Sequence, residues 1–326
     1  MKKLGRVVGI LLTLAILAAP FLVWWQWNAL YDWYLLRGYT PPAAIISLAD
    51  QDTFNSYTKH LFYVNRPLLL NTVSSFRQYC PENENTIVLG CYHSGQQGIY
   101  IYNVQDPTLA GVQQVTAAHE VLHSIYARLS TKDRNYVDGL LESYYKTGLQ
   151  DQRVLAEVKI YQQTEPNDVM DEMNSTFGTE IADLPAALNT YYAQFFTNRQ
   201  AIVAFEQSYQ GEFTQRQAQI AADDAQLASL KSNIDAEEQN LKQQSAQINT
   251  DRSRLDSEQS SGQYQAYNSQ VDAFNAEINS YNQGVAKLKA DITNYNNLVN
   301  TRNAIGQALD SLDSALDTRL STQSAQ

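Results

Sequence analysis

A His-Glu-x-x-His motif at residues 119–123 combines side chains that bind metals with one that moves protons. Apolar residues around it recur at helical spacing, which predicts a helix over 111–129 with no internal Gly or Pro. Positions i and i+4 of a helix lie one turn apart on the same face, so His119 and His123 can both bind one metal ion. Glu120 can then take a proton from a metal-bound water and pass it to a leaving group.

The helix resembles the active-site helix of the zincin metallopeptidases, in which small and apolar residues surround the His-Glu pair and the second His. The resemblance covers roughly residues 95–180 and not the whole chain. It implies a Zn2+ ion bound by His119 and His123, with Glu120 as the general base and acid of peptide-bond hydrolysis. The alternative is an amphipathic helix with two structural histidines, but the chain has only four histidines and two of them form this pair.

A catalytic zinc site requires three protein ligands and one open position for water. No histidine follows His123, which leaves a downstream carboxylate, the arrangement of the gluzincins. Residues 171–176, Asp-Glu-Met-Asn-Ser-Thr, resemble the Asn-Glu-x-x-Ser-Asp element of that group, and this resemblance implies that Glu172 is the third ligand. Glu157 and Glu180 remain as alternatives.

The element departs from the gluzincin pattern at two positions. Asp171 stands where Asn is usual, and Thr176 stands where an Asp orients the first zinc-binding histidine. The Thr176 hydroxyl can still hydrogen-bond an imidazole, although a neutral partner raises the basicity of the ligand less. Peptide hydrolysis also needs a group that stabilises the oxyanion. Several side chains are suitable, and the sequence does not choose among them: His93, Tyr100, Tyr102, Tyr126 and Tyr161.

The elements around the motif predict an α+β domain, mostly α-helical, over residues 41–210. Dense β-branched and aromatic residues predict a strand over 98–104, before the motif helix. In zincins such a strand is the sheet edge that faces the cleft, so the resemblance implies that it pairs with an extended peptide substrate; an internal strand is the alternative. The remaining predictions are helices over 43–62, 130–147, 151–163 and 167–177, a long helix from 183, a strand over 87–89, and no assignment for 67–78.

Cys80 and Cys91 are the only cysteines of the chain. A turn-forming cluster and a strand-like run separate them, and their spacing is not that of a Cys-x-x-Cys zinc motif. We predict a disulfide between them, which an oxidising compartment permits and which contributes about 3 kcal/mol to the free energy of unfolding in the chain-entropy model. Two free buried thiols are the alternative.

The N-terminal residues 1–40 predict a membrane anchor. The apolar stretch Val7–Trp25 is long enough to cross about 30 Å of hydrocarbon as a helix. The basic residues before it outweigh the charges after it, so the positive-inside rule places the N-terminus in the cytoplasm and the bulk of this single-pass plasma-membrane protein outside. Aromatic residues typical of a membrane interface follow: Trp24, Trp25, Trp27, Tyr31, Trp33 and Tyr34.

A cleaved signal peptide is the alternative to an anchor, with an apolar segment over 7–17 and a small-residue site at Ala18-Ala19. Pro20 would directly follow such a cut, and the apolar run continues to Trp25. We therefore favour an uncleaved anchor. Both interpretations place most of the chain outside the cytoplasm.

Residues 211–320 predict an antiparallel coiled-coil hairpin. Apolar residues recur every seven positions over 213–255, and an alternation by three and four follows over 264–295. The sequence Ser-Ser-Gly at 260–262 marks the turn between the two helices. The second helix carries two apolar columns and the first carries one, which leaves apolar surface either for Val299–Leu320 folding back or for a partner chain.

Charge and composition exclude other functions. The net charge of −11 argues against nucleic acid as a partner, because the chain has too few cations to neutralise phosphates. No phosphate-binding loop, Ser–His–Asp signature or nucleotide motif occurs. The last residues, 321–326, predict a disordered tail.

The sequence favours a membrane-anchored, extracytoplasmic zinc metallopeptidase. Its expected partners are a peptide or protein substrate, the membrane and, through the coiled coil, another protein or a second copy. The alternative is an envelope scaffold or adaptor that works through its coiled coil and carries a non-catalytic zincin-like domain. A third hypothesis combines the two, with an active site that is restrained until the coil engages a partner.

Overall fold

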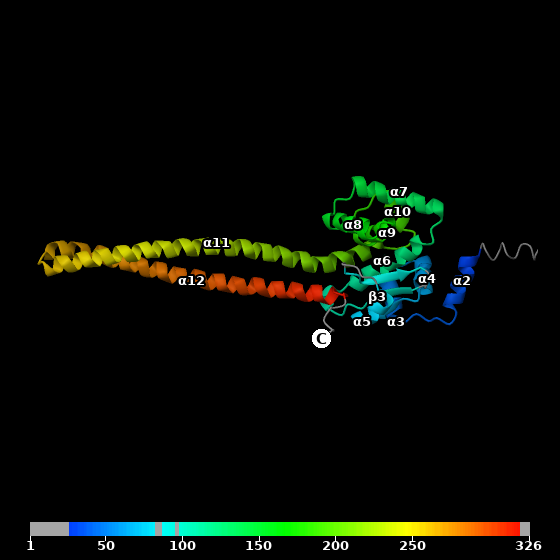
Figure 1. Ribbon diagram of the computed structural model, residues 1–326, viewed down its shortest axis with the longest axis horizontal. Coiled ribbons are helices and arrows are strands. Elements are labelled where there is room, and N and C mark those ends of the chain that lie inside the picture. The colour runs from blue at the N-terminus through cyan, green and yellow to red at the C-terminus, as the bar shows by residue number, and fades with distance from the viewer. Residues whose placement is uncertain (1–25, 82–86, 95–97, 320–326) are drawn as a thin grey trace, which may run out of the picture. The chain divides into compact units, whose positions relative to one another are not determined.

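The computed structural model describes residues 26–81, 87–94 and 98–319. These residues are mostly helical and contain one small sheet, so the predicted α+β, mostly helical class is confirmed. In chain order the elements are α2 (Trp27–Leu36), α3 (Ala43–Gln51), α4 (Ser56–Val64), β1 (Leu68–Leu70), α5 (Val73–Tyr79), β2 (Gly90–His93), β3 (Gly98–Tyr102), the 3-10 turn η1 (Pro107–Leu109), α6 (Val112–Tyr126), α7 (Thr131–Thr147), α8 (Gln152–Thr164), α9 (Val169–Glu180), α10 (Ala186–Tyr192), α11 (Arg199–Ser260) and α12 (Tyr264–Leu316) (Figure 1).

The chain divides into two compact units. The first comprises Met1–Gln210 together with Ala315–Gln326, and the second comprises Gly211–Ser314. The chain therefore leaves the first unit after α11 has begun and returns to it as α12 ends. The first unit holds the sheet and the His-Glu-x-x-His helix, and the second consists of the two long helices.

The sheet has the strand order β1-β3-β2. β1 pairs with β3 in parallel, and β2 pairs with β3 antiparallel, with Cys91 opposite Tyr100. β3 is thus the central strand, and the prediction that residues 98–104 form a substrate-facing edge is wrong, because β1 pairs on one side of β3 and β2 on the other. The edge strand that contacts α6 is β2, which begins at Gly90 and not at Ile87 as predicted.

Two of the predicted helices are each divided in two, and the two points of division lie next to each other. The predicted helix over 43–62 divides into α3 and α4, and the long helix predicted before the hairpin divides into α10 and α11. Thr53 has a positive φ of 54°, and Asn55 caps α4 through its side chain. The backbone N–H of Asn55 donates to the carbonyl of Phe195 at 3.0 Å, and that of Thr197 donates to Thr53 at 2.8 Å. The backbone groups left free at one break form hydrogen bonds with those at the other break. The helix propensity of either segment alone does not predict these bonds.

Helix α6 lies at the centre of the first unit, against the sheet on one side and against α9 on the other (Figure 1). Its Ala117, Ala118, Val121 and Leu122 are completely buried. The small residues allow neighbouring elements to approach the helix closely. A helix buried on most of its surface retains polar residues only where they have partners or a function, which focuses attention on its histidines.

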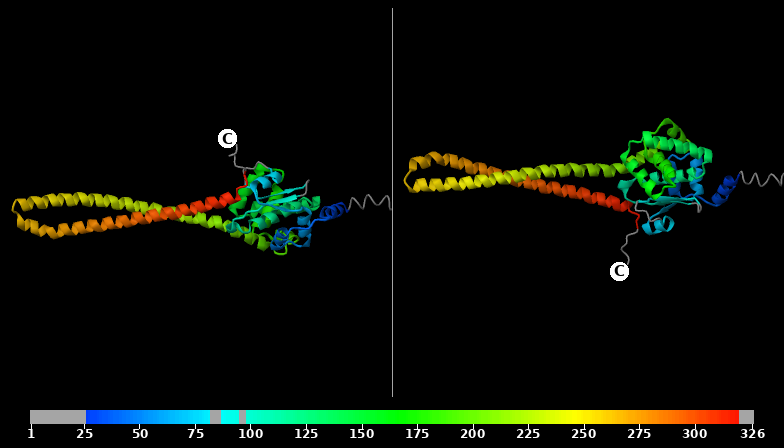
Figure 2. Two further views of the ribbon diagram at one scale, coloured as in Figure 1. Left: turned by 90° about the horizontal axis from the view of Figure 1, so that it is seen from below. Right: turned by 45° about the horizontal axis from the view of Figure 1, so that its top comes forward.

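The second unit is the predicted helical hairpin. α11 and α12 run antiparallel and are joined by a turn in which Gly262 has a φ of +78° (Figure 2). Gly284 of α12 lies against α11, since a Cβ there would sit 2.8 Å from Leu241 Cδ2. The Arg302 guanidinium makes two hydrogen bonds to Asp224, at 2.9 and 3.3 Å, which is a further contact between the two helices.

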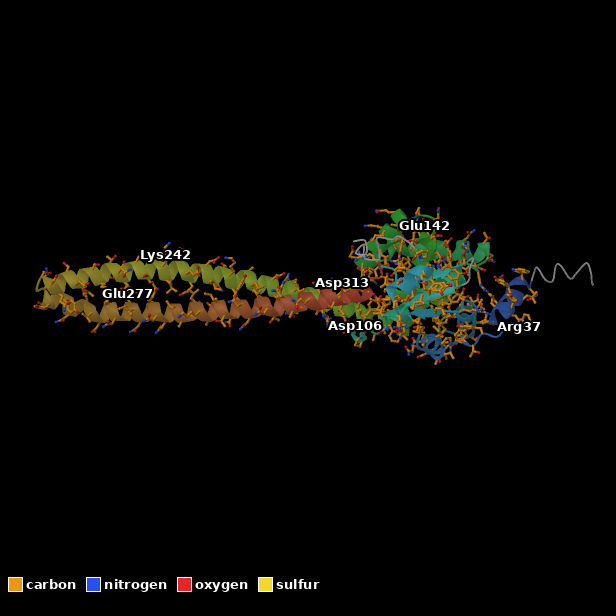
Figure 3. All side chains as sticks on the ribbon, turned by 60° about the horizontal axis from the view of Figure 1, so that its bottom comes forward. Arg37, Asp106, Glu142, Lys242, Glu277 and Asp313 are labelled. Atoms are coloured by element: carbon orange, nitrogen blue, oxygen red, sulfur yellow. A yellow bond between two sulfur atoms is a disulfide. The ribbon has the colours of Figure 1, made fainter. Side chains whose placement is uncertain are left out.

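Helix α12 continues without a break to Leu316, so the alternative in which Val299–Leu320 folds back over the hairpin is wrong. Side chains cover both helices along their length (Figure 3), and apolar ones remain partly open to solvent. Ile292 is 37% exposed and Tyr264 is 63% exposed. A partner chain remains the expected cover for this surface.

Two sequence predictions fall outside the described residues. Among residues 26–81, 87–94 and 98–319, no helix is both long enough and apolar enough to cross a membrane. The predicted anchor and the predicted tail over 321–326 are not among these residues.

Candidate metal centre

The start of α6 is fixed by a glycine. Gly111 precedes the helix with a φ of +106°, a conformation that suits glycine. A Cβ at this position would lie 2.9 Å from the Cβ of Phe205 in the first turns of α11. From this start, His119 and His123 lie one turn apart, with their ring centroids separated by 4.8 Å.

Helix α9 brings Glu172 opposite the two histidines. The Nε2 atom of His119 lies 3.5 Å from one carboxylate oxygen of Glu172, and the Nε2 atom of His123 lies 3.6 Å from the other. The three candidate ligand atoms all lie within 4.8 Å of one another. Between 11% and 17% of each side chain is exposed, so the group is largely desolvated but still accessible.

The close approach of α9 to α6 depends on Gly178. A Cβ at this position would lie 2.5 Å from Leu122 Cδ1 and 2.7 Å from Tyr192 Cε1. The predicted end of this helix at residue 177 is wrong, because α9 continues through Gly178 to Glu180. The glycine is required for helix packing, and this packing holds Glu172 next to the histidines.

Asp171 holds the ring of His123 in place. The Nδ1–H of His123 donates to Asp171 Oδ1 at 2.8 Å. With Nδ1–H held by Asp171, Nε2 faces Glu172 and is the nitrogen that would bind a metal on losing its proton. The orienting role that the resemblance suggested for Thr176 is not seen: its hydroxyl is buried and has no hydrogen-bond partner among the described residues. The one sequence signal for Asp171 was its place directly before the predicted ligand.

The electrostatic environment attracts positive charge. Burial lowers the pKa of His123, but Glu172 and Asp171 outweigh burial and raise the pKa to about 10. Burial likewise lowers the pKa of His119, and the neighbouring Glu172 reverses the shift so that the net pKa is raised. Burial raises the pKa of Glu172, yet the two histidines hold it below its ordinary value. The carboxylates that retain protons on the imidazoles would equally stabilise a bound cation.

Glu120 lies beside this group, against the edge strand β2. It is 6% exposed, and burial raises the pKa of its carboxyl although His123 and His119 lower it. A Cβ on Gly90 of β2 would lie 2.6 Å from Glu120 Oε1 and 2.6 Å from Thr116 Cγ2. The absence of a side chain at position 90 therefore leaves the space that the Glu120 carboxylate occupies.

The two alternative ligands serve another interaction. Glu180 and Glu157 form ion pairs with Arg153, at 2.6 and 3.4 Å, and Glu206 of α11 joins them at 2.8 Å. Burial and the charge of Glu157 raise the pKa of Glu180 to about 7, against the opposing effect of Arg153. This group ties α8, α9 and the beginning of α11 together within the first unit. Of the three candidate carboxylates, Glu172 is the one that the structure brings together with both histidines.

Among the oxyanion candidates, Tyr161 has a phenol close to the site. It donates a hydrogen bond to Glu157 at 2.9 Å. Burial, Glu157 and Glu172 raise its pKa far above the ordinary value, so the phenol keeps its proton. Tyr126 donates instead to Asp138, at 2.7 Å. The other three contact groups of the α5 and β2 region: Tyr100 stacks on Tyr79, Tyr102 packs near Phe76, and His93 hydrogen-bonds the Tyr79 carbonyl.

The predicted disulfide is present. Cys80, at the end of α5, is bonded to Cys91 of β2, with their Cα atoms 6.0 Å apart. His93 Nε2 lies 3.4 Å from Cys91 Sγ, so these residues form a second possible metal-binding group. The disulfide leaves no thiolate for a metal, and we assign the pair a structural role, tying α5 to the edge strand.

Comparison with protein-family models, with curated proteins and with solved structures finds no match to this chain. The function is therefore inferred from the geometry of the site and from the motifs of the sequence.

Proposed function

We propose that this chain is a membrane-anchored, extracytoplasmic zinc metallopeptidase of the gluzincin type. The observation that carries the proposal is that one ligand atom each of His119, His123 and Glu172 lie within 4.8 Å of one another, with both Nε2 atoms facing the Glu172 carboxylate. Glu172 comes from a helix distant in sequence from α6, so the convergence is a property of the tertiary structure and is independent of the five-residue motif.

The donor set suits a catalytic zinc ion. Two imidazole nitrogens and one carboxylate oxygen are the ligands of one common class of catalytic zinc site, which leaves the fourth position to water or substrate. Asp171 supports the assignment, because metal-binding histidines commonly donate their other N–H to a carboxylate. When bound, zinc would polarise a peptide carbonyl and lower the pKa of water.

Residues of the chain itself would transfer the protons and orient the metal-binding histidine. Glu120 lies beside the ligands with a raised pKa, which suits a group that must accept a proton and then release it to the leaving amine. Asp171 would keep the His123 ring in one orientation throughout. The Tyr161 phenol keeps its proton and donates it to Glu157, so Tyr161 would stabilise an oxyanion by exchanging that hydrogen bond for one to the substrate.

The edge strand β2 is the proposed place for an extended substrate. It pairs only with β3 among the described strands, so its other edge has backbone groups to offer. Gly90 places this strand directly against Glu120. A peptide added to β2 would run past the proposed base, which is the role that the sequence had suggested for residues 98–104.

The cellular placement is part of the proposal. The apolar stretch Val7–Trp25 would anchor the chain with its N-terminus in the cytoplasm. The disulfide between Cys80 and Cys91 supports an oxidising compartment for the first unit.

The test is the zinc content of the purified full chain, measured for wild type, Glu172→Ala and Glu157→Ala. We expect one tightly bound equivalent in wild type and Glu157→Ala, and a loss of at least about tenfold in affinity for Glu172→Ala. Loss of zinc in Glu157→Ala alone would identify Glu157 on α8 as the third ligand. A wild-type protein without bound zinc would refute the metallopeptidase.

A scaffold or adaptor function is the second candidate, favoured by the partly exposed apolar residues of α12. Ile292 is 37% exposed, more than a completed coiled-coil seam allows. Zinc binding without turnover on any peptide, together with capture of a helical partner by the hairpin, would favour the scaffold.

A further inference from the structure

Helix α2 is fixed to the first unit through its one charged residue. Asp32 is 5% exposed, and both its oxygens accept hydrogen bonds from the Arg128 guanidinium, at 2.7 and 2.8 Å. The Nε2 atom of His60 on α4 lies 3.1 Å from the same carboxylate. Such a bidentate, mostly buried pair is directional, so it sets the orientation of α2 and not only its proximity.

A second contact holds the C-terminal end of α2. The Arg66 side chain donates to the carbonyl of Leu35 at 3.1 Å. A cation at this end of a helix also compensates the partial negative charge of its last carbonyls. α2 is therefore held by α4, by Arg66 two residues after α4 and by Arg128 two residues after α6, although it lies at the margin of the unit (Figure 1).

The face of α2 opposite Asp32 is aromatic, uncharged and open. Five of the fourteen large hydrophobic side chains that are exposed among the described residues belong to this one helix, and the others are scattered. Trp33 is 63% exposed, and Arg37, just past the helix, stacks over its ring at 5.7 Å. We name this surface the α2 face and define it by Trp27, Leu30, Tyr31, Trp33 and Tyr34.

We infer that the α2 face lies in the headgroup boundary of the membrane and that Asp32 and Arg128 hold the metal centre beside the bilayer, so that the substrates are membrane-proximal segments of membrane-bound polypeptides. The substrate class rests on the proposed peptidase function; the membrane contact does not.

The residues that precede α2 indicate that the membrane covers the α2 face. The apolar stretch Val7–Trp25 ends two residues before Trp27, where α2 begins. If that stretch crosses the bilayer, the start of α2 must lie at its surface. Trp and Tyr carry an apolar body with a polar tip and concentrate at this depth. The one charge that would oppose insertion, Asp32, is turned away and neutralised by Arg128.

The metal centre lies near the residue that fixes α2. Arg128 follows His123 by five residues, about 7 Å along a helix axis. The Arg128 side chain extends from there to the carboxylate of Asp32. The site is thus on the order of 15 Å from α2, which is within reach of a polypeptide segment that has just left the membrane.

The membrane contact is tested with the full chain in phosphatidylcholine vesicles, with and without lipid brominated near the headgroup end of the acyl chain. The reporter variant keeps Trp33 and carries Trp24→Phe, Trp25→Phe and Trp27→Phe. Its fluorescence should fall at least about twofold, because an interfacial helix buries its apolar face about 5–10 Å deep. The control replaces all four Trp by Phe and adds Tyr136→Trp on α7, where Tyr136 is 62% exposed, and should stay unquenched.

Equal quenching of both reporters, or of neither, would overturn the membrane contact. An unquenched Trp33 together with self-association of the full chain would assign the α2 face to a second copy instead. This readout requires no enzymatic activity, so it is independent of the proposed function.

The substrate class is tested with two membrane-anchored reporters. Each carries a transmembrane helix followed by an unstructured casein segment, attached directly in one and after a long Gly-Ser spacer in the other. Wild type should cleave the near segment at least about tenfold faster, through its higher effective concentration. Asp32→Asn should reduce that ratio. Trp27→Ser combined with Tyr34→Ser should reduce the same ratio. Both side chains are exposed, so the double substitution should leave folding unchanged.

Equal cleavage of the near and far segments by wild type would overturn the substrate class. No cleavage of either reporter by the zinc-loaded protein would overturn the proposed peptidase function and the substrate class with it, while the quenching result would still decide the membrane contact.

Discussion

Asp171 and Glu172 are neighbours in the chain but act on different atoms of the histidines. Asp171 accepts the Nδ1–H of His123, and Glu172 faces the Nε2 atoms of His123 and His119. One short segment of α9 thus provides both the candidate ligand and its support. Because adjacent helical residues point in directions about 100° apart, both can reach the site only if α9 crosses α6 closely.

Replacing Glu120 by Gln tests the proposed base. The amide keeps the size of the side chain but cannot take up a proton, so we expect zinc to remain bound and the rate of peptide hydrolysis to fall by at least about 10²-fold. Zinc content and turnover of the same preparation are the measurements. Unchanged turnover would rule out Glu120 as the base.

Asp171 is expected to act through the orientation and basicity of His123. Asp171→Ala removes the hydrogen-bond acceptor and should weaken zinc affinity about 10–100-fold. Asp171→Asn keeps an acceptor oxygen without the charge and should lose less zinc affinity than Asp171→Ala. Competition with a chelator measures both affinities, and equal affinity of Asp171→Ala and wild type would contradict the positioning role.

At the scale of elements, the site depends on contacts of α6 with three other segments. Gly178 permits the approach of α9, Gly111 that of α11, and Gly90 that of β2. At each of these glycines a Cβ would meet a neighbouring atom at 2.9 Å or less. Two of these contacts lie at the motif itself, where β2 meets Glu120 and α9 meets Leu122, and the third fixes the start of the helix.

Gly178→Ala should separate α9 from α6. The added methyl meets Leu122 and Tyr192, and overpacking of this kind costs about 1–3 kcal/mol of unfolding free energy. Zinc affinity should fall as well, since Glu172 moves with its helix. Denaturant unfolding and chelator competition are the measurements.

Gly139→Ala is the matched control. Gly139 lies within the exposed face of α7, and a Cβ there meets nothing within 4 Å. The substitution should stabilise the protein by about 0.5–1 kcal/mol through helix propensity and leave zinc affinity unchanged. A stabilising Gly178→Ala would show that α9 is not packed as described.

At the scale of the whole molecule, the hairpin is an insertion within the first unit. Residues 315–319 return to that unit, where Thr318 is completely buried. The Thr318 hydroxyl donates to the carbonyl of Val88 at 2.7 Å, and Arg77 donates to the carbonyl of Thr318 at 2.8 Å. Val88 lies just before β2, so the end of the chain helps to hold the strand that borders Glu120.

Thr318→Val should destabilise the first unit. Valine has the shape of threonine but leaves the Val88 carbonyl without its donor, at a cost of about 1–3 kcal/mol. The unfolding transition of the first unit should shift down by a few degrees, about 2–4 °C per kcal/mol, while that of the hairpin stays in place. Calorimetry of the full chain measures both.

Thr301→Val is the control for this substitution, because Thr301 is exposed on α12 and its hydroxyl bonds only to its own helix, at Asn297. It should change the unfolding free energy by less than about 0.5 kcal/mol. A single transition that responds equally to both variants would show that the two units do not unfold separately.

The sequence by itself predicted the features that repeat locally. The His-Glu-x-x-His helix, the hairpin with its turn at 260–262 and the mostly helical class follow from periodicity within single segments. The pairing of Cys80 with Cys91 followed because no other cysteine exists. Glu172 was proposed as a ligand from a motif resemblance, and the structure brings it to both histidines.

Only the tertiary structure decided which segments meet. It placed β3 in the centre of the sheet and β2 at the edge, gave Asp171 its contact with His123, and turned Asp32 toward Arg128. It also broke two predicted helices where their backbones pair. Each of these outcomes depends on hydrogen bonds or close packing between residues far apart in the chain, and such contacts leave no periodic signal within either segment.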